Sequence, residues 1–149
     1  MTINKVLKNI TASEQSNAAL PLRLIAGIIF TAHGAQKLFA WFGGYGLEAT
    51  GQWMQSIGIT PGYLMALMAG SAEFFGGLLL IIGLLTRPTS FVLAITMAVA
   101  IVTVHLEHGL FMSNNGYEFA LSLLAISISL MISGAGKLSL DNKIVQRLT

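Results

Sequence analysis

The chain has 149 residues, of which 54% are hydrophobic and only 9% are charged, with a formal net charge of +2. Because a soluble domain carries about 25% charged residues, this composition excludes an ordinary soluble enzyme and predicts one compact integral membrane domain. The chain contains no cysteine, which excludes disulfides, thiol relays and thiolate-bound iron–sulfur clusters on this chain.

The N-terminal segment, residues 1–19, is polar, and a short interfacial helix and a disordered tail are both open for it. The first membrane span is predicted over residues 20–41, with Pro21 in the first helical turn. Arg23 lies near its start, where a long side chain can reach the lipid headgroups. Because Arg23 interrupts the apolar run and no Ala-x-Ala-like cleavage site precedes His33, we expect a retained span rather than a signal peptide.

The connection between the first two spans has a helical pattern of its own. Gly43 and Gly44 interrupt the first helix, and five residues then recur at helical spacing: Leu47, Thr50, Trp53, Met54 and Ile57. This spacing predicts a short amphipathic helix at the bilayer surface, with an ordinary capping loop as the alternative. Thr60 and Pro61 mark the start of the second span, as its cap and its first-turn residue.

The second span, residues 62–85, carries one ionisable group near its middle, Glu73. Its length suits a helix that crosses about 30 Å of hydrocarbon. A carboxylate at that depth costs at least a few kcal/mol unless another group inside the protein receives it. Glu73 therefore predicts a polar partner on a neighbouring helix.

Two further spans complete the predicted domain. Residues 86–88, Thr-Arg-Pro, are typical of a tight turn, and the third span follows over residues 89–106. A loop rich in turn residues leads to the fourth span, residues 117–133, which Gly134 and Gly136 end.

We therefore predict an all-α, integral membrane four-helix bundle over residues 20–134, with a polar cytoplasmic tail over residues 135–149. Four spans place both termini on one side of the membrane. Seven of the eight basic residues fall on that side, so the positive-inside rule predicts cytoplasmic termini in a bacterial inner (plasma) membrane. These seven are Lys5, Lys8, Arg23, Arg87, Lys137, Lys143 and Arg147.

The polar residues of the spans fall into two layers when their depth is counted at about 1.5 Å per residue. His33 and Glu73 both lie roughly 18–20 Å from the cytoplasmic side, and Lys37, His105 and Glu118 lie roughly 24–26 Å from it. This pattern predicts a polar pocket that opens outward. Glu73 and His33 are its candidate catalytic pair, and Lys37, His105 and Glu118 are its candidate substrate-binding residues.

The same residues also admit a structural interpretation, since polar contacts fix the packing of membrane helices. In chemical terms, a His–Glu pair suits proton exchange with a bound quinol, and Lys37 suits a phenolate oxygen. No metal is predicted, because the Glu-x-x-His spacing of di-iron bundles is absent. A haem on His33 and His105 is disfavoured, because their depths differ by roughly 6 Å.

Several segments match a pattern found in one family of membrane proteins. They are residues 33–39, 42–47, 72–77, 83–88, 105, 114–118 and 134–141. Over about residues 20–141 the chain thereby resembles the DoxX family. The resemblance implies a four-span inner-membrane protein. Because the family is named for a subunit of a thiosulfate:quinone oxidoreductase, it also implies a link to quinone chemistry or to oxidative-stress responses.

The leading hypothesis is therefore a component of a quinone-linked oxidoreductase. Because four short helices enclose little volume, we expect a homo-oligomer or a membrane complex. Two alternatives stay open: a non-enzymatic scaffold or assembly subunit for a redox partner, and a small proton-coupled transporter. The sequence has no nucleotide-binding motif, so a flavin or nicotinamide would have to sit on a partner, and no nucleic-acid partner is needed to explain its basic residues.

Overall fold

The computed structural model describes residues 6, 9–14 and 16–148, and every regular element among them is helical. Residues 1–5, 7–8 and 15 of the predicted N-terminal segment, and residue 149, lie outside the described residues. The all-α class predicted from the sequence is confirmed.

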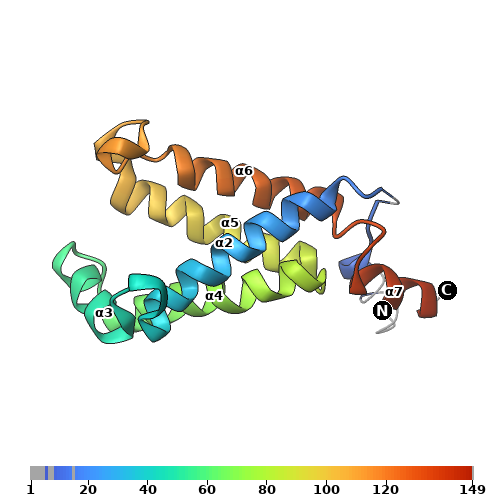
Figure 1. Cartoon of the computed structure of the whole chain (residues 1–149), viewed down its shortest axis with the longest axis horizontal. Helices are drawn as coiled ribbons and strands as arrows, with labels where there is room; N and C mark the ends of the chain where they lie inside the picture. The colour runs from blue at the N-terminus through green and yellow to red at the C-terminus, as the bar shows by residue number, and fades with distance from the viewer. Residues whose placement is uncertain (1–5, 7–8, 15, 149) are drawn as a thin grey trace.

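Two helix pairs build the bundle (Figure 1). α2 (Ala19–Phe39) packs along α4 (Gly62–Ile82), and α5 (Thr86–Ala100) packs along α6 (Glu118–Ser133). The two pairs diverge toward the end that carries α3 (Gly46–Ser56), and both chain termini lie at the opposite end. We call the end with α3 the open end and the end with the termini the closed end.

Glycine residues let α2 and α4 approach closely. A Cβ atom at Gly27 of α2 would lie 2.8 Å from the carbonyl oxygen of Gly77 on α4. A Cβ atom at Gly70 of α4 would lie 2.8 Å from Cδ2 of Leu38 on α2. Small residues at such an interface allow membrane helices to gain packing contacts. Side chains on the facing sides of α2 and α4 are thereby brought within bonding reach of each other.

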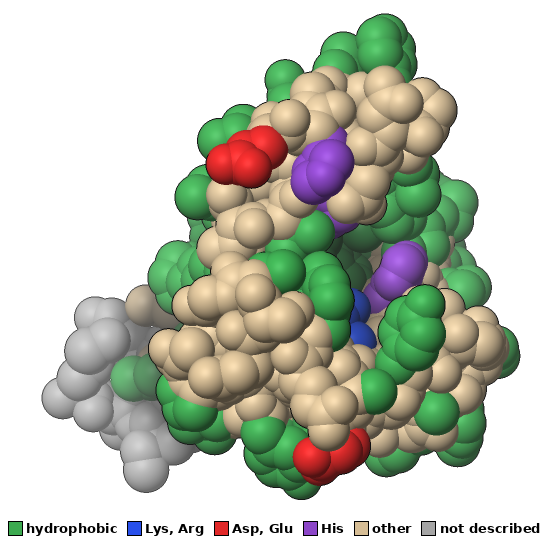
Figure 2. All heavy atoms as spheres, turned by 90° about the vertical axis from the view of Figure 1, so that its left-hand side faces the viewer, with side chains coloured by type: hydrophobic (Ala, Val, Ile, Leu, Met, Phe, Trp, Pro, Cys, Tyr) green, Lys and Arg blue, Asp and Glu red, His purple; other side chains and the backbone are tan. Residues whose placement is uncertain are grey.

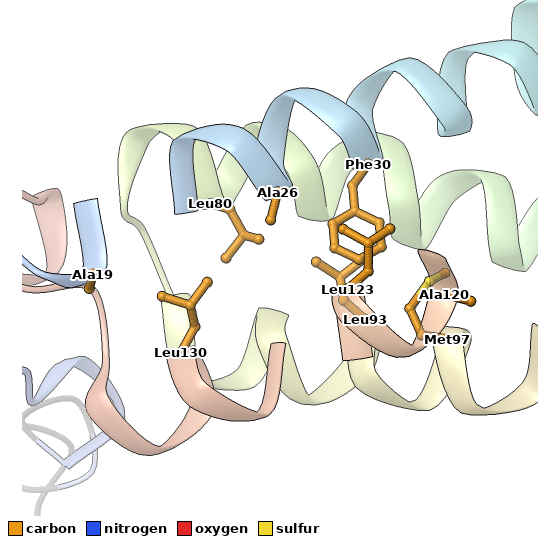
Figure 3. Packing of buried hydrophobic residues seen from close by; sticks show 9 residues of the cluster. All are labelled: Ala19, Ala26, Phe30, Leu80, Leu93, Met97, Ala120, Leu123 and Leu130. Atoms are coloured by element: carbon orange, nitrogen blue, oxygen red, sulfur yellow. The ribbon is translucent and has the colours of Figure 1, made fainter. Parts of the chain in front are cut away.

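An apolar cluster fills the space between the two pairs (Figure 3). Its largest members come from all four helices and are at most 4% exposed: Phe30 of α2, Leu80 of α4, Leu93 of α5, and Leu123 and Leu130 of α6. The cluster separates the open end of the bundle from the closed end.

Two helical segments among the described residues are long and apolar enough to cross a membrane. They are Gly62–Ile82, with 21 residues, and Thr86–His108, with 23 residues. The second combines α5 with a π-helical turn, η2 (Ile101–His105), and a 3-10 turn, η3 (Leu106–His108). α6 is apolar but has only 16 residues. The count of four spans therefore stays a prediction.

The helix predicted between the first two spans is confirmed as α3, and its position at the bilayer surface stays a prediction. Thr50 and Met54 of the predicted face are buried, whereas Trp53 and Ile57 of the same face are 45% and 41% exposed. The end of the last apolar helix is also confirmed, because α6 stops at Ser133 and Gly134 follows with φ 78°.

Two boundary predictions are wrong. α4 begins at Gly62, as predicted, but Thr60 gives it no side-chain cap and Pro61 is its N-cap residue rather than a first-turn residue. Residues 86–88 form the first turn of α5 rather than a tight turn, and α4 already ends at Ile82, before Gly83. Pro88 fits there because a residue in the first turn of a helix has no helical partner for a backbone N–H.

The predicted reach of Arg23 to the lipid headgroups is wrong. Arg23 is 2% exposed, and its guanidinium donates hydrogen bonds to four backbone carbonyls. Two of them, at Leu80 (3.1 Å) and Ile81 (2.7 Å), belong to the last turn of α4, where carbonyls lack a partner within the helix. The other two, Ala135 (3.0 Å) and Leu138, belong to the segment after α6. Arg23 therefore closes this end of the bundle.

Part of the segment predicted as a polar tail folds into α7 (Leu140–Leu148), which docks on the turn between α4 and α5. The Asp141 carboxylate is 1% exposed and accepts the N–H groups of Leu85 (2.7 Å) and Thr86 (2.9 Å). Burial raises the pKa of Asp141, and these N–H donors oppose the shift because they stabilise the charged form. The tail is thus part of the closed end.

Replacing Arg23 with Lys should lower the free energy of unfolding by about 2–4 kcal/mol, because an ammonium cannot serve four carbonyls placed on two segments. Thermal unfolding in detergent, followed by circular dichroism, measures the loss. Arg87→Lys is the matched control, since within the described part of the chain Arg87 donates to two carbonyls, those of Ala12 and Met131. Equal losses in the two variants would contradict the role assigned to Arg23.

Candidate functional site

The open end of the bundle is hollowed between the two helix pairs. Figure 2 looks directly at this end and shows a recess in the surface, with Lys or Arg atoms inside it and a histidine at its edge. Two patches of Asp or Glu side chains and another histidine lie on the surface around the recess, and the Lys or Arg atoms of this view lie inside it.

An ion pair joins α2 and α4 at the open end. The Glu73 side chain on α4 is 4% exposed, and its Oε2 atom accepts a hydrogen bond from Lys37 Nζ on α2 at 2.6 Å. The Lys37 side chain is 25% exposed. The Glu73 carboxylate is therefore enclosed. The Lys37 ammonium that neutralises it is partly exposed at the protein surface and has two further N–H donors.

The close helix approach explains why Glu73 finds its partner on α2. A Cβ atom at Gly34 would lie 2.3 Å from the backbone nitrogen of Phe74, and one at Gly70 would lie 3.2 Å from Cβ of Lys37. Both glycines therefore keep the helices close enough for the Lys37 side chain to reach Glu73. The partner predicted from the sequence was His33. The structure pairs Glu73 with Lys37, which lies one helical turn farther along the same face of α2.

His33 instead faces the second helix pair. Its ring lies 5.9 Å, centroid to centroid, from the ring of Phe119 on α6, with the planes tilted by 48°. His33 is half-buried. An imidazole thus lies between α2 and α6, one turn from the ion pair, where the two helix pairs begin to separate.

His105 and Glu118 hold the connection between α5 and α6. His105 Nδ1 lies 2.7 Å from the carbonyl oxygen of Asn115, and Glu118 Oε1 accepts the Met112 N–H at 2.6 Å. No hydrogen bond or ion pair joins either residue to Lys37 within residues 16–148. The structure therefore brings Glu73 and Lys37 together, places His33 beside them, and gives His105 and Glu118 partners in their own loop.

The π-helical turn η2 is a feature that the sequence did not indicate. It ends at His105 and follows α5 directly, so α5 and η3 continue as one rod with a local change of winding. Such turns occur frequently at functional sites. Here the turn ends at His105, whose Nδ1 lies beside the carbonyl oxygen of Asn115 in the loop at the open end.

Two other kinds of site, a metal centre and the cavity at the closed end, are weaker candidates. Among the described residues, no group of three or more His, Asp or Glu side chains could hold a metal ion. A cavity of about 330 Å³ lies at the closed end, between the start of α2 and the end of α6. Its lining includes Ser16, Leu22 and Ser133, and it does not include the ion pair. The Glu73–Lys37 pair with His33 is therefore the candidate site.

A double-mutant cycle should show that the buried pair is energetically coupled. Lys37→Met should lower the free energy of unfolding by about 3 kcal/mol, because it leaves a carboxylate buried without its counter-charge. Adding Glu73→Gln to that variant should recover part of the loss, because neither charge then remains. Denaturant unfolding in detergent micelles measures all four proteins, and strictly additive losses would mean that the two side chains do not interact.

Comparison with known proteins places these features in a family. A family model described as DoxX matches residues 18–106. The chain is 41% identical over 122 residues to "Putative oxidoreductase CatD" of Bacillus subtilis, covering 82% of this chain and 83% of that protein. It is 31% identical over 147 residues to "Uncharacterized membrane protein Rv3486" of Mycobacterium tuberculosis, covering 92% and 87%. No solved structure matches the chain.

Proposed function

Because the chain belongs to the DoxX family, we propose that it is the membrane component of a quinone-linked oxidoreductase, with the ring of the quinone bound in the recess at the open end. The observation that carries the proposal is the enclosed Glu73 carboxylate, whose partner Lys37 remains accessible from outside. Ionisable groups within membrane-spanning segments are costly and usually serve a function. The word oxidoreductase in the name of the Bacillus subtilis relative supports the same class of reaction.

Each residue of the site has a part in this chemistry. Oxidation of a quinol releases two protons and two electrons, so the site must accept protons as the electrons leave. Glu73 and His33 are the groups that take up these protons. Lys37 has N–H donors to spare for a quinone oxygen, and the Phe119 ring beside His33 offers an apolar wall for the quinone ring. The electrons pass to a redox centre on a partner protein.

The proposal includes the four-span topology over residues 20–134, with cytoplasmic termini and an outward-facing recess. The main objection to a first span in α2 is the charge of Arg23, and its four carbonyl partners answer that objection. α6 is only about 24 Å long at 1.5 Å per residue, and the segment after it stays at the closed end, where Ala135 and Leu138 accept hydrogen bonds from Arg23. The excess of basic residues on the side of the termini supports the orientation.

Native mass spectrometry of the full chain, extracted gently from its own membranes, tests the function. The expected result is a bound mass that matches a quinone, and its loss in the Lys37→Met/Glu73→Gln double variant, which removes both charges of the site. Glu107→Gln is the matched control, because Glu107 is an exposed carboxylate near the open end. This control should keep the quinone.

Other outcomes would favour the alternatives. A chain that carries only phospholipid would support a scaffold or assembly subunit for a redox partner. A quinone that survives in the double variant would place its site elsewhere. A proton-coupled transporter needs a path from the recess to the closed end, and the apolar cluster around Phe30, Leu93 and Leu123 lies across that direction. Solute flux into proteoliposomes that depends on Glu73 would support the transporter.

A further inference from the structure

α7 is bonded directly to the turn between the two longest apolar segments. The Asp141 carboxylate accepts the N–H groups of Leu85 and Thr86, and the Asp141 N–H donates to the Gly83 carbonyl at 2.9 Å. Gly62–Ile82 and Thr86–His108 are the two segments long enough to cross a membrane. Because the turn between two spans lies at a membrane surface, α7 must lie at that surface whatever the number of spans.

The start of α7 is held in one orientation. Ser139 Oγ accepts the Asn142 N–H at 3.1 Å, in the manner of a helix cap, and Asn142 Nδ2 donates to the Lys137 carbonyl at 2.8 Å. Ser139, Asp141 and Asn142 are all buried against the bundle. This fixed inner face determines which side chains of α7 point away from the protein.

The outward face of this segment is basic. Lys137, Lys143 and Arg147 are exposed, and Lys143 and Arg147 lie on one side of α7 at i, i+4. The acidic residue of α7, Asp141, is buried with its carboxylate engaged, so it does not neutralise them. Leu138 and Leu140, 58% and 38% exposed, lie next to these cations. We call these five residues the α7 basic surface.

We propose that the α7 basic surface binds the phosphate groups of anionic phospholipids. An amphipathic helix at the interface places its cations among the headgroups and its apolar side chains at the boundary with the acyl chains. Clusters of Lys and Arg close to a span are attracted to anionic lipid. A free phosphate ion would leave Leu138 and Leu140 without a function, whereas a lipid uses both parts of the surface. The inference requires only that Gly62–Ile82 and Thr86–His108 cross a membrane, so it is independent of the quinone site.

The test uses the full chain in nanodiscs made from equal amounts of phosphatidylglycerol and phosphatidylcholine. Native mass spectrometry then counts the lipids that stay bound when the discs are dissolved. The wild-type chain should retain phosphatidylglycerol in preference to phosphatidylcholine. The K137Q/K143Q/R147Q variant should reduce that preference by about tenfold or more, because it removes three attractive charges. High ionic strength during extraction should weaken the wild-type preference.

The K137R/K143R/R147K variant is the matched control, because it keeps every charge and should keep the preference. All three side chains are exposed, so thermal unfolding should be the same in the three proteins. A wild-type chain without a preference would overturn the proposal. A preference that survives neutralisation, or one that the charge-retaining variant loses, would also overturn it. Binding of soluble polyglutamate at the expense of phosphatidylglycerol would point to an acidic protein partner instead and overturn the assignment to lipid.

Discussion

The guanidinium of Arg23 is the contact on which the closed end depends. A helix ends with carbonyls that have no partner inside the helix, and in an apolar environment each of them is costly. One side chain of α2 supplies donors to two such carbonyls of α4, at Leu80 and Ile81, and to two carbonyls after α6. Arg23 thereby joins three separate segments. With Asp141 on the neighbouring turn, it leaves the closed end without free backbone groups at these positions.

The open end also buries a charged group, but its charge is balanced in a different way. There the buried charge is a carboxylate, and its partner is a single flexible Lys rather than a set of fixed carbonyls. Among the described residues, the guanidinium of Arg23 has four acceptors, whereas the ammonium of Lys37 has one and keeps two donors. The same physical requirement, to neutralise a charge inside an apolar bundle, thus closes one end and leaves a reactive group accessible at the other.

Much of this arrangement follows from the sequence, and the failures have physical causes. Glu73 within an apolar run required a polar partner on another helix, and α2 provides it. The identity of that partner was missed because His33 and Lys37 share one face, so a depth error of one turn exchanges them. Arg23 was misassigned because the sequence does not reveal which carbonyls lack partners. α7 was missed because the bonds of Asp141 connect residues that are far apart in the chain.

The two ends together limit how a ligand can reach the site. The apolar cluster around Phe30 and Leu93 fills the middle of the bundle, and the hydrogen bonds of Arg23 and Asp141 hold the end with the termini together. Access to Glu73 and Lys37 is therefore from the open end or sideways between the separating helix pairs. A lipid-soluble quinone can arrive by the second route without crossing water. Membrane lipid then has two proposed roles: it dissolves the proposed substrate, and its anionic headgroups bind α7 on the opposite side.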